Sequence, residues 1–172
     1  EKVSRIDGFG GRIRMRRWPM DCDRAVVVSG RSGGIPSFFD SAVGGSGSSP
    51  TSPLGAGHRK IRDGEPVLVD LVHVHRGYVS DCTRMFSSGA MSKEWAQRLE
   101  DMAQISDLVV SKLGAGGSCS EAWYEGKSLS AELGYDHHLM GMPPHQARFL
   151  GHSVGLELDE SPVVAGGFDR PM

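Results

Sequence analysis

Cysteine is scarce in this sequence, with three residues in 172, at positions 22, 82 and 119. They form neither an even set nor a closely spaced Cys-x-x-Cys pair, which excludes a disulfide-stapled scaffold and a zinc-finger type of site. Such cysteine usage favours a reducing, cytoplasmic location. Long apolar runs are absent too: no stretch reaches the roughly 20 residues of a membrane-spanning helix, and the N-terminus lacks a signal-peptide pattern. We therefore expect no membrane partner.

Charge of one sign is not in excess, since the formal net charge is −2. This balance gives no general attraction to nucleic acid, which we do not expect as a partner. A basic run, Arg12 to Trp18, alternates as a strand would and places Arg12, Arg14 and Arg16 on one side. We interpret this side as solvated or facing a second subunit, so that a homodimer is conceivable. The length and the ordinary composition are those of one globular domain.

A carboxylate within an apolar run is the most informative feature that the sequence does contain. Asp70 interrupts the run from Val67 to Val72, where an unpaired carboxylate would cost several kcal/mol. Residues 66–74 and 78–86 have the composition of two strands, and His75-Arg76-Gly77 can turn between them. The segment therefore predicts an antiparallel hairpin with a charge in its apolar part.

A second aspartate of this hairpin, Asp81, would place another negative charge close to that of Asp70. If the turn is centred between His75 and Arg76, Asp70 and Asp81 lie opposite one another, with Cβ atoms about 5 Å apart. Two like charges so placed repel unless a divalent cation lies between them. We therefore predict a metal site. The alternative is that Asp81 caps a turn near Ser80 and Thr83, while backbone donors hold Asp70.

Two blocks of the sequence resemble the pita-bread metallopeptidases, which include Xaa-Pro aminopeptidases, prolidases, methionine aminopeptidases and the metal-free creatinase. The first block runs from Asp70 through Gly77-Tyr78, Ser80-Asp81 and Thr83-Arg84 to Gly89, and is similar to the family's first metal-ligand hairpin. The second, Gly151 to Glu157, is similar to its Gly-His-Gly-Ile-Gly-Leu-Glu stretch. The style of both blocks is closer to the Xaa-Pro members than to the methionine members.

The resemblance implies that Asp70, Asp81 and His152 are metal ligands, for two divalent ions such as manganese, cobalt, iron or zinc. It also implies two glutamate ligands further along, but no glutamate follows Glu160 in this sequence. The family's His-Glu-x-Pro motif reads Asp159-Glu160-Ser161-Pro162, so that an acid replaces a histidine on the substrate side. A second such histidine would fall near Ser52 or Pro53, and the spacing of His58 does not fit.

The resemblance implies an α+β pita-bread fold, in which helices cover one face of a curved antiparallel sheet. Residues 1–172 would then be a single catalytic-type domain that lacks the last strands of this fold, as in a C-terminally truncated chain. The sequence also predicts the strands and helices that such a fold requires. The strands are expected at 11–18 and 24–29, one helix from Ser92 to Gly114, and a second helix from a capping box at 118–121 to Gly134. Residues 30–57, rich in Gly, Ser and Pro, are either a flexible connector or a wall of the substrate cleft with Phe38 and Phe39 as contacts.

Several single residues carry weaker expectations. Cys82 and Trp95 are predicted in the core, because each falls on an apolar face of its element. His73 and His75 are predicted at the surface or in the turn. His137, His138 and His145 surround a Met-Gly-Met-Pro-Pro loop, where one of them, with His145 the candidate, could replace the missing substrate histidine.

The function implied by the resemblance is metal-dependent removal of an N-terminal residue from a peptide, of the Xaa-Pro type, by a metal-activated water. One alternative is an inactive peptidase-like domain that binds a peptide or protein partner, as in some histone chaperones. Asp159 and the absent glutamates favour this alternative, whereas the retention of Asp70, Asp81 and His152 opposes it. A creatinase-like, metal-free C–N hydrolase is the second alternative, with little use for a pair of aspartates.

Overall fold

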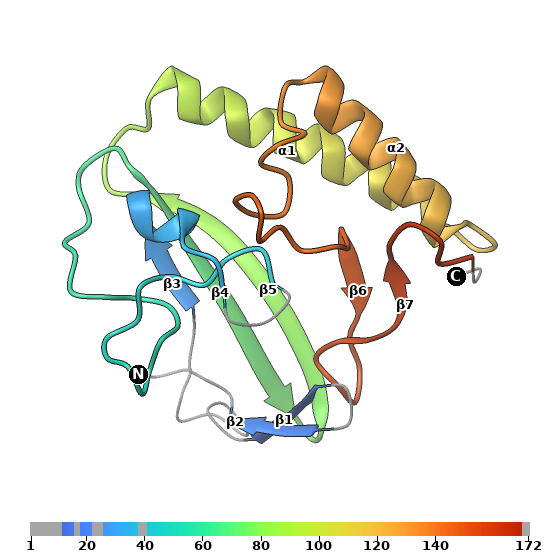
Figure 1. Cartoon of the computed structure of the whole chain (residues 1–172), viewed down its shortest axis with the longest axis horizontal. Helices are drawn as coiled ribbons and strands as arrows, with labels where there is room; N and C mark the ends of the chain where they lie inside the picture. Colours follow the sequence, from blue (N-terminus) through green and yellow to red (C-terminus); the bar gives the residue numbers. More distant parts are fainter. Residues whose placement is uncertain (1–11, 16–17, 22–25, 38–40, 170–172) are drawn as a thin grey trace.

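The computed structural model describes residues 12–15, 18–21, 26–37 and 41–169. These residues form antiparallel sheets and two α-helices (Figure 1). The strands are paired as follows: β1 (Arg12–Met15) with β2 (Trp18–Asp21); β3 (Val26–Ser29) with β4 (Pro66–His75), and β4 with β5 (Tyr78–Ser87); β6 (Gly151–Ser153) with β7 (Glu160–Val164). The predicted α+β class is therefore confirmed, and so is the long hairpin. The single strand expected over 11–18 is wrong, because the chain reverses there and β2 pairs back onto β1.

Two helices follow the long hairpin and lie together along one side of the sheets (Figure 1). α1 (Lys93–Lys112) begins after Ser92, whose side chain accepts a hydrogen bond from the backbone N–H of Trp95. α2 (Cys119–Glu132) begins after Ser118, which accepts from the N–H of Glu121 in the same way. Both starts agree with the sequence, because a serine at the N-cap satisfies a backbone donor that the helix leaves open. Neither these helices nor any other in the described ranges is long and apolar enough to cross a bilayer.

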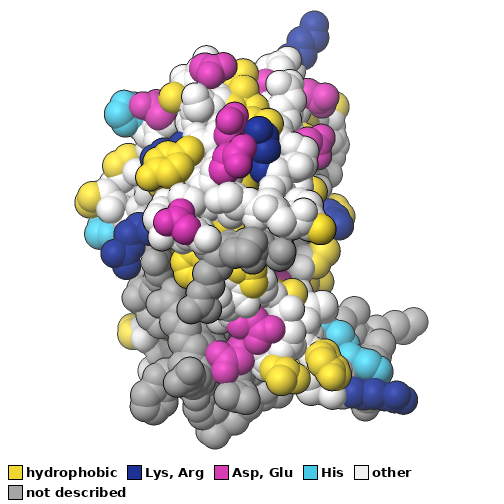
Figure 2. Space-filling model, turned by 90° about the vertical axis from the view of Figure 1, so that its right-hand side faces the viewer, with side chains coloured by type: hydrophobic (Ala, Val, Ile, Leu, Met, Phe, Trp, Pro, Cys, Tyr) yellow, Lys and Arg dark blue, Asp and Glu magenta, His cyan; other side chains and the backbone are white. Residues whose placement is uncertain are grey.

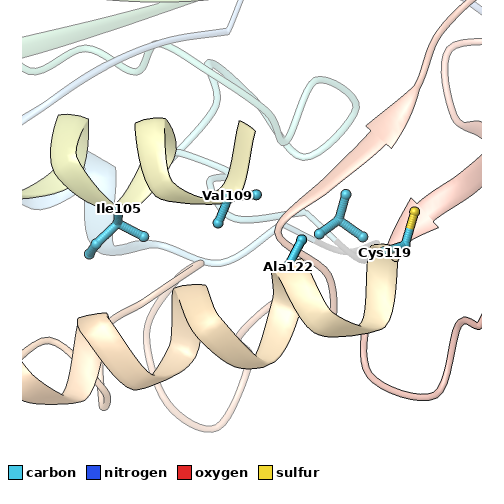
Figure 3. Packing of buried hydrophobic residues seen from close by; sticks show 5 residues of the cluster. Ile105, Val109, Cys119 and Ala122 are labelled. Carbon is cyan, nitrogen blue, oxygen red and sulfur yellow. The ribbon is translucent and has the colours of Figure 1, made fainter. Parts of the chain in front are cut away.

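The main core lies between the two helices and the β6–β7 hairpin. Figure 3 shows Ile105 and Val109 of α1 facing Cys119 and Ala122 of α2. Cys119 and Ala122 are completely buried, and Val164 of β7 joins the same cluster. This packing fixes β6, and with it His152, relative to the helices. Apolar burial of this kind is the main term that holds such elements together.

Two residues predicted in the core lie at the surface instead. Cys82 is exposed on β5, on the face of the hairpin opposite the aspartates. Trp95 is 38% exposed at the start of α1, where Arg98 lies over its ring at 4.8 Å from the centroid. A cation above an indole ring stabilises an exposed tryptophan, so an apolar stripe does not by itself decide burial.

The glycine- and serine-rich segment between β3 and β4 has more structure than the sequence suggested. It begins with a 3-10 helix, η2 (Gly30–Gly34), and Gly44 donates from its N–H to the carbonyl of Ile35 at 2.9 Å. Gly55 donates to the carbonyl of Gly44 at 2.7 Å, which closes the loop on itself. The described part is therefore tied by backbone bonds, unlike a flexible connector. Phe38 and Phe39, the expected cleft contacts, lie outside the described residues.

One face of the molecule shows no concentration of basic side chains over its described part (Figure 2). Basic, acidic and hydrophobic groups are interspersed there. The basic run at 12–17 does not bear on this, because the side chains of β1 and β2 are not described.

Candidate metal site

The β4–β5 hairpin places both aspartates on one face, but in a different register from the predicted one. The turn residues are Arg76 and Gly77, both with positive φ (51° and 87°), so that His75 pairs with Tyr78. Asp70 then lies opposite Thr83, and Asp81 lies opposite Val72. The predicted direct pairing of the two aspartates is wrong, because a two-residue turn with two left-handed residues shifts the centre by one position. Moving the centre of the turn by one residue changes the partner of each strand residue by two positions. Because side chains two apart on a strand share a face, Asp70 and Asp81 still lie on the same face.

Thr83, opposite Asp70, is a partner that the sequence analysis did not identify. Its Oγ1 donates a hydrogen bond to Asp70 Oδ1 at 2.5 Å. A donor on one oxygen restricts the rotation of the carboxylate. With the correct register the alternation of β5 would have pointed to Thr83, since it lies two residues after Asp81.

The pKa of Asp81, on this face, is shifted by its surroundings. Burial raises the pKa of its carboxyl group, the negative charge of Asp70 raises it further, and His152 lowers it. A quarter of the Asp81 side chain is exposed. A carboxylate whose charge is disfavoured by a neighbouring carboxylate forms a place where a cation gains binding energy.

His152 reaches the same place from β6. Its Nε2 lies 3.8 Å from Asp81 Oδ2, and a fifth of the side chain is exposed. Its Nδ1 lies 3.2 Å from the carbonyl of Ser153, which can only accept a hydrogen bond, so Nδ1 must be the donor. In a neutral ring Nε2 then carries a lone pair toward Asp81, the arrangement that a metal ligand requires. In a doubly protonated ring the two groups form an ion pair instead.

The donor set fits a divalent cation, although it is not yet a closed cage. Across the described ranges, no group of three His, Cys, Asp or Glu side chains is assembled closely enough to hold an ion by itself. The chemistry is nevertheless that of a hard or borderline metal, with two carboxylates and one imidazole whose second nitrogen is already engaged. Asp81 thus lies near both Asp70 and His152, and metal binding by the three residues stays a prediction.

The other predicted site residues are dispersed. Asp159 is half-buried in the connection just before β7. His145 is exposed, and so are His137 and His138. His58 bonds through Nε2 to the carbonyl of Ser48 at 3.2 Å, within the loop that precedes β4. The structure therefore gives no direct support to a substrate role for His145.

The hairpin histidines differ from each other. His75 is exposed beside the turn, as predicted. His73 is half-buried and pairs with Ser80, whose hydroxyl donates to the carbonyl of His73 at 3.4 Å. By strand alternation His73 points away from the face of Asp70, so it does not extend the candidate site.

A hollow of about 330 Å³ lies between α1 and the β6–β7 hairpin. Its lining is mostly apolar, with Met102, Ile105 and Val109 among its members, and it includes His152 but neither Asp70 nor Asp81. The polar chemistry is therefore centred on the hairpin side of His152 and not in this hollow.

Comparison with known proteins decides the family. Residues 21–172 match the profile of Metallopeptidase family M24. The chain belongs to this family. Its M24 fold is confirmed by the solved structures that it resembles, which are pita-bread proteins.

Three of the proteins that this M24 chain resembles show how far the similarity extends. The Xaa-Pro dipeptidase of Lactobacillus delbrueckii subsp. lactis is 25% identical over 153 residues, which cover 86% of this chain and 40% of the dipeptidase. The X-Pro aminopeptidase of Thermotoga maritima has a TM-score of 0.70 at 20% identity, over 98% of this chain and 39% of its own. The N-terminal domain of the FACT complex subunit SPT16 from chickpea has a TM-score of 0.60 at 17% identity, over 87% of this chain and 31% of its own.

The M24 chain thus spans about two fifths of the length of the peptidases that it matches. The region that it shares with them includes the hairpin with both aspartates and the strand with His152. The activity of the whole protein is accordingly a matter for proposal.

Proposed function

We propose that this chain supplies the first part of a dinuclear metal site in a peptidase that removes an N-terminal residue, of the Xaa-Pro type. Asp70, Asp81 and His152 are the ligands in this proposal. The observation that supports it is the approach of His152 to Asp81, at 3.8 Å, from a strand far along the chain from the hairpin. Membership of family M24 and the similarity to an Xaa-Pro dipeptidase support the same reaction class.

The residues of this chain would hold and orient the metal. Thr83 fixes one oxygen of Asp70, and the carbonyl of Ser153 fixes the proton of His152 on Nδ1. Both contacts restrict the orientation of a ligand, as the hydrogen-bond partners of metal ligands do. The three residues would hold a divalent ion, which would supply a lowered pKa for a water and so hydroxide at neutral pH. Manganese, cobalt, iron and zinc all suit these donors.

The remaining elements of the proposal follow from the sequence. The substrate is a peptide with a free N-terminus, and the setting is the reducing cytoplasm that few cysteines favour. The two glutamate ligands that the resemblance implies have no counterpart after Glu160 in this sequence.

Metal binding is the first test. Manganese is titrated into the chain by calorimetry, with metal content checked by elemental analysis, for the wild type, Asp70→Asn, Asp81→Asn and Asp107→Asn. Asp107 is an exposed aspartate of α1, so its variant is a matched control. We expect Asp70→Asn and Asp81→Asn to weaken binding by about tenfold or more, with the control equal to wild type. Equal binding by all four proteins would reject the assignment of the ligands.

Turnover is the second test. Hydrolysis of an Xaa-Pro dipeptide and of a longer Xaa-Pro peptide is compared with that of the same peptides blocked at the N-terminus. The proposal expects cleavage of the free peptides with manganese present, and loss of that cleavage in Asp70→Asn. Unchanged turnover in Asp70→Asn would reject the metal mechanism.

One observation favours a second candidate function. Asp159 stands where the family's motif has a histidine, and the fold is shared with a domain of the FACT complex subunit SPT16 as well as with peptidases. A peptidase-like domain that binds a protein partner would show no cleavage of any Xaa-Pro peptide. Metal binding without turnover would favour this candidate.

A further inference from the structure

The connection between β6 and β7, residues 154–159, contacts the metal-ligand hairpin directly. The carbonyl of Gly155 accepts a hydrogen bond from the N–H of Val79 at 2.7 Å. Val79 is buried on β5, 8% exposed, and lies two residues before Asp81 on the same face of the strand. The connection therefore joins the strand of His152 to the strand of Asp81.

Glu160 holds this connection from within. Its Oε2 accepts a hydrogen bond from the backbone N–H of Glu157 at 3.3 Å, and the N–H of Gly155 donates to the carbonyl of Glu157 at 3.2 Å. Its Oε1 lies against Gly155, so closely that a Cβ at position 155 would overlap it. One carboxylate thus contacts both residues that shape the connection.

We infer that Glu160 is a positioning residue that sets the approach of His152 to Asp81 through Gly155. The contacts form a short path. The Glu160 carboxylate lies against Gly155, and the carbonyl of Gly155 accepts a hydrogen bond from Val79. Asp81 lies two residues after Val79 on the same face of β5. On the other side, the ladder pairs Ser153, the neighbour of His152, with Glu160, next to an irregularity at His152 and Ser153. Glu160 is therefore connected to both ligands through their neighbours.

The positioning role rests on the proposed function in one respect, because the approach of His152 to Asp81 matters for function only if these residues bind a metal. The positions themselves can be tested without metal. Glu160→Gln keeps an oxygen that accepts from the N–H of Glu157, whereas Glu160→Ala removes it. Gly155→Ala is an independent variant, since its added Cβ would displace the end of the Glu160 side chain while the backbone at 155 does not need glycine.

The first readout is amide hydrogen exchange by NMR, with circular dichroism to confirm that each variant is folded. Losing the support of the connection frees the Val79 N–H, so we expect Glu160→Ala and Gly155→Ala to speed its exchange by about tenfold. The amides of Ile105 and Val109 in the helix core should not change. Glu160→Gln should remain close to wild type. Glu100→Ala, at an exposed position of α1, is the matched control.

The second readout is the imidazole proton resonances of His152, and the third is manganese affinity. The alanine variants should shift these resonances and weaken manganese binding by about tenfold, with rescue by glutamine. If wild type binds no manganese, the proposed function fails, and the Val79 and His152 readouts decide the positioning role alone. Unchanged Val79 exchange and unchanged His152 resonances in both alanine variants would overturn it. So would manganese affinity that stays at the wild-type value while Val79 exchange rises.

Discussion

Asp70 and Asp81 are diagonal neighbours on one face of the β4–β5 hairpin, because Asp70 pairs with Thr83 and Asp81 pairs with Val72. A diagonal pair is further apart than a direct one, by a few Å at the Cβ atoms. The negative charge of Asp70 still raises the pKa of Asp81. The two groups are therefore further apart than a direct pair would be, yet close enough to interact electrostatically.

Thr83 is predicted to support metal binding although it is not a ligand. Thr83→Val removes the hydroxyl that donates to Asp70 Oδ1 at 2.5 Å and keeps the shape of the side chain. Without that donor the carboxylate is less well oriented, and we expect manganese affinity to fall by about tenfold. Thr83→Ser keeps the hydroxyl and should stay near wild type. Equal calorimetric affinities for the valine and serine variants would contradict this prediction.

The face of each hairpin residue could be predicted from the sequence, and the register could not. Alternation along a strand fixes which side chains share a face, and an error of two in the pairing leaves that unchanged. The register depends on which two residues turn. Arg76 adopts a positive φ of 51°, which a non-glycine residue rarely does, so a left-handed turn at Arg76-Gly77 was harder to predict than one centred between His75 and Arg76.

Exposure of Cys82 leads to a chemical prediction. In a Cys22→Ser background, which leaves the two described thiols, Ellman's reagent should react at once with Cys82, which is exposed. Cys119 is completely buried and should react only after denaturation. Cys82→Ser should abolish the fast phase. A native protein with two fast thiols, or with none, would show that the surface of β5 differs from the one described.

Cys82 and Trp95 were misjudged for a common physical reason. Periodicity identifies an apolar face, but burial requires another element to cover that face. Trp95 lies at the first turn of α1, with Arg98 over its ring, and α2 packs further along the helix. The helix starts were predicted correctly because capping by Ser92 and Ser118 is local and needs no tertiary partner.

Gly126 in α2 is predicted to be a packing requirement. Alanine usually stabilises a helix interior by about 1 kcal/mol relative to glycine. Here the added Cβ would lie 2.6 Å from Val109 Cγ2 and 2.8 Å from Leu150 Cδ1, so Gly126→Ala should instead destabilise the fold by about 1–3 kcal/mol. Chemical denaturation measures this change in the free energy of unfolding.

A double variant tests the cause of that loss. Val109→Ala makes room for the new Cβ, so the pair Val109→Ala and Gly126→Ala should be more stable than the sum of the single effects implies. Gly114→Ala is the control, because nothing lies within 4 Å of its added Cβ. Additive effects of the two substitutions would mean that the loss has another source than contact between α1 and α2.

The ion pair of Arg59 and Glu65 ties the start of β4 to the end of β3. Arg59 donates from both terminal nitrogens to the Glu65 carboxylate, at 2.7 and 2.5 Å, and also to Ser29 Oγ at 2.9 Å. The backbone N–H of Arg62 donates to the same carboxylate at 2.8 Å. The Arg59 hydrogen bond, followed by that of Arg62, lowers the pKa of Glu65 from 4.5 to about 2.

This lowered pKa predicts how stability depends on pH. Because the folded state holds the carboxylate charged, its contribution is complete above 4.5 and is lost as the pH falls toward about 2. Glu65→Gln should be less stable than wild type at neutral pH, and the difference should shrink across that range. Urea denaturation at a series of pH values measures it, with Glu100→Gln as an exposed control. A difference that stays constant from neutral pH to the acid end would show that Glu65 acts through shape and not through its charge.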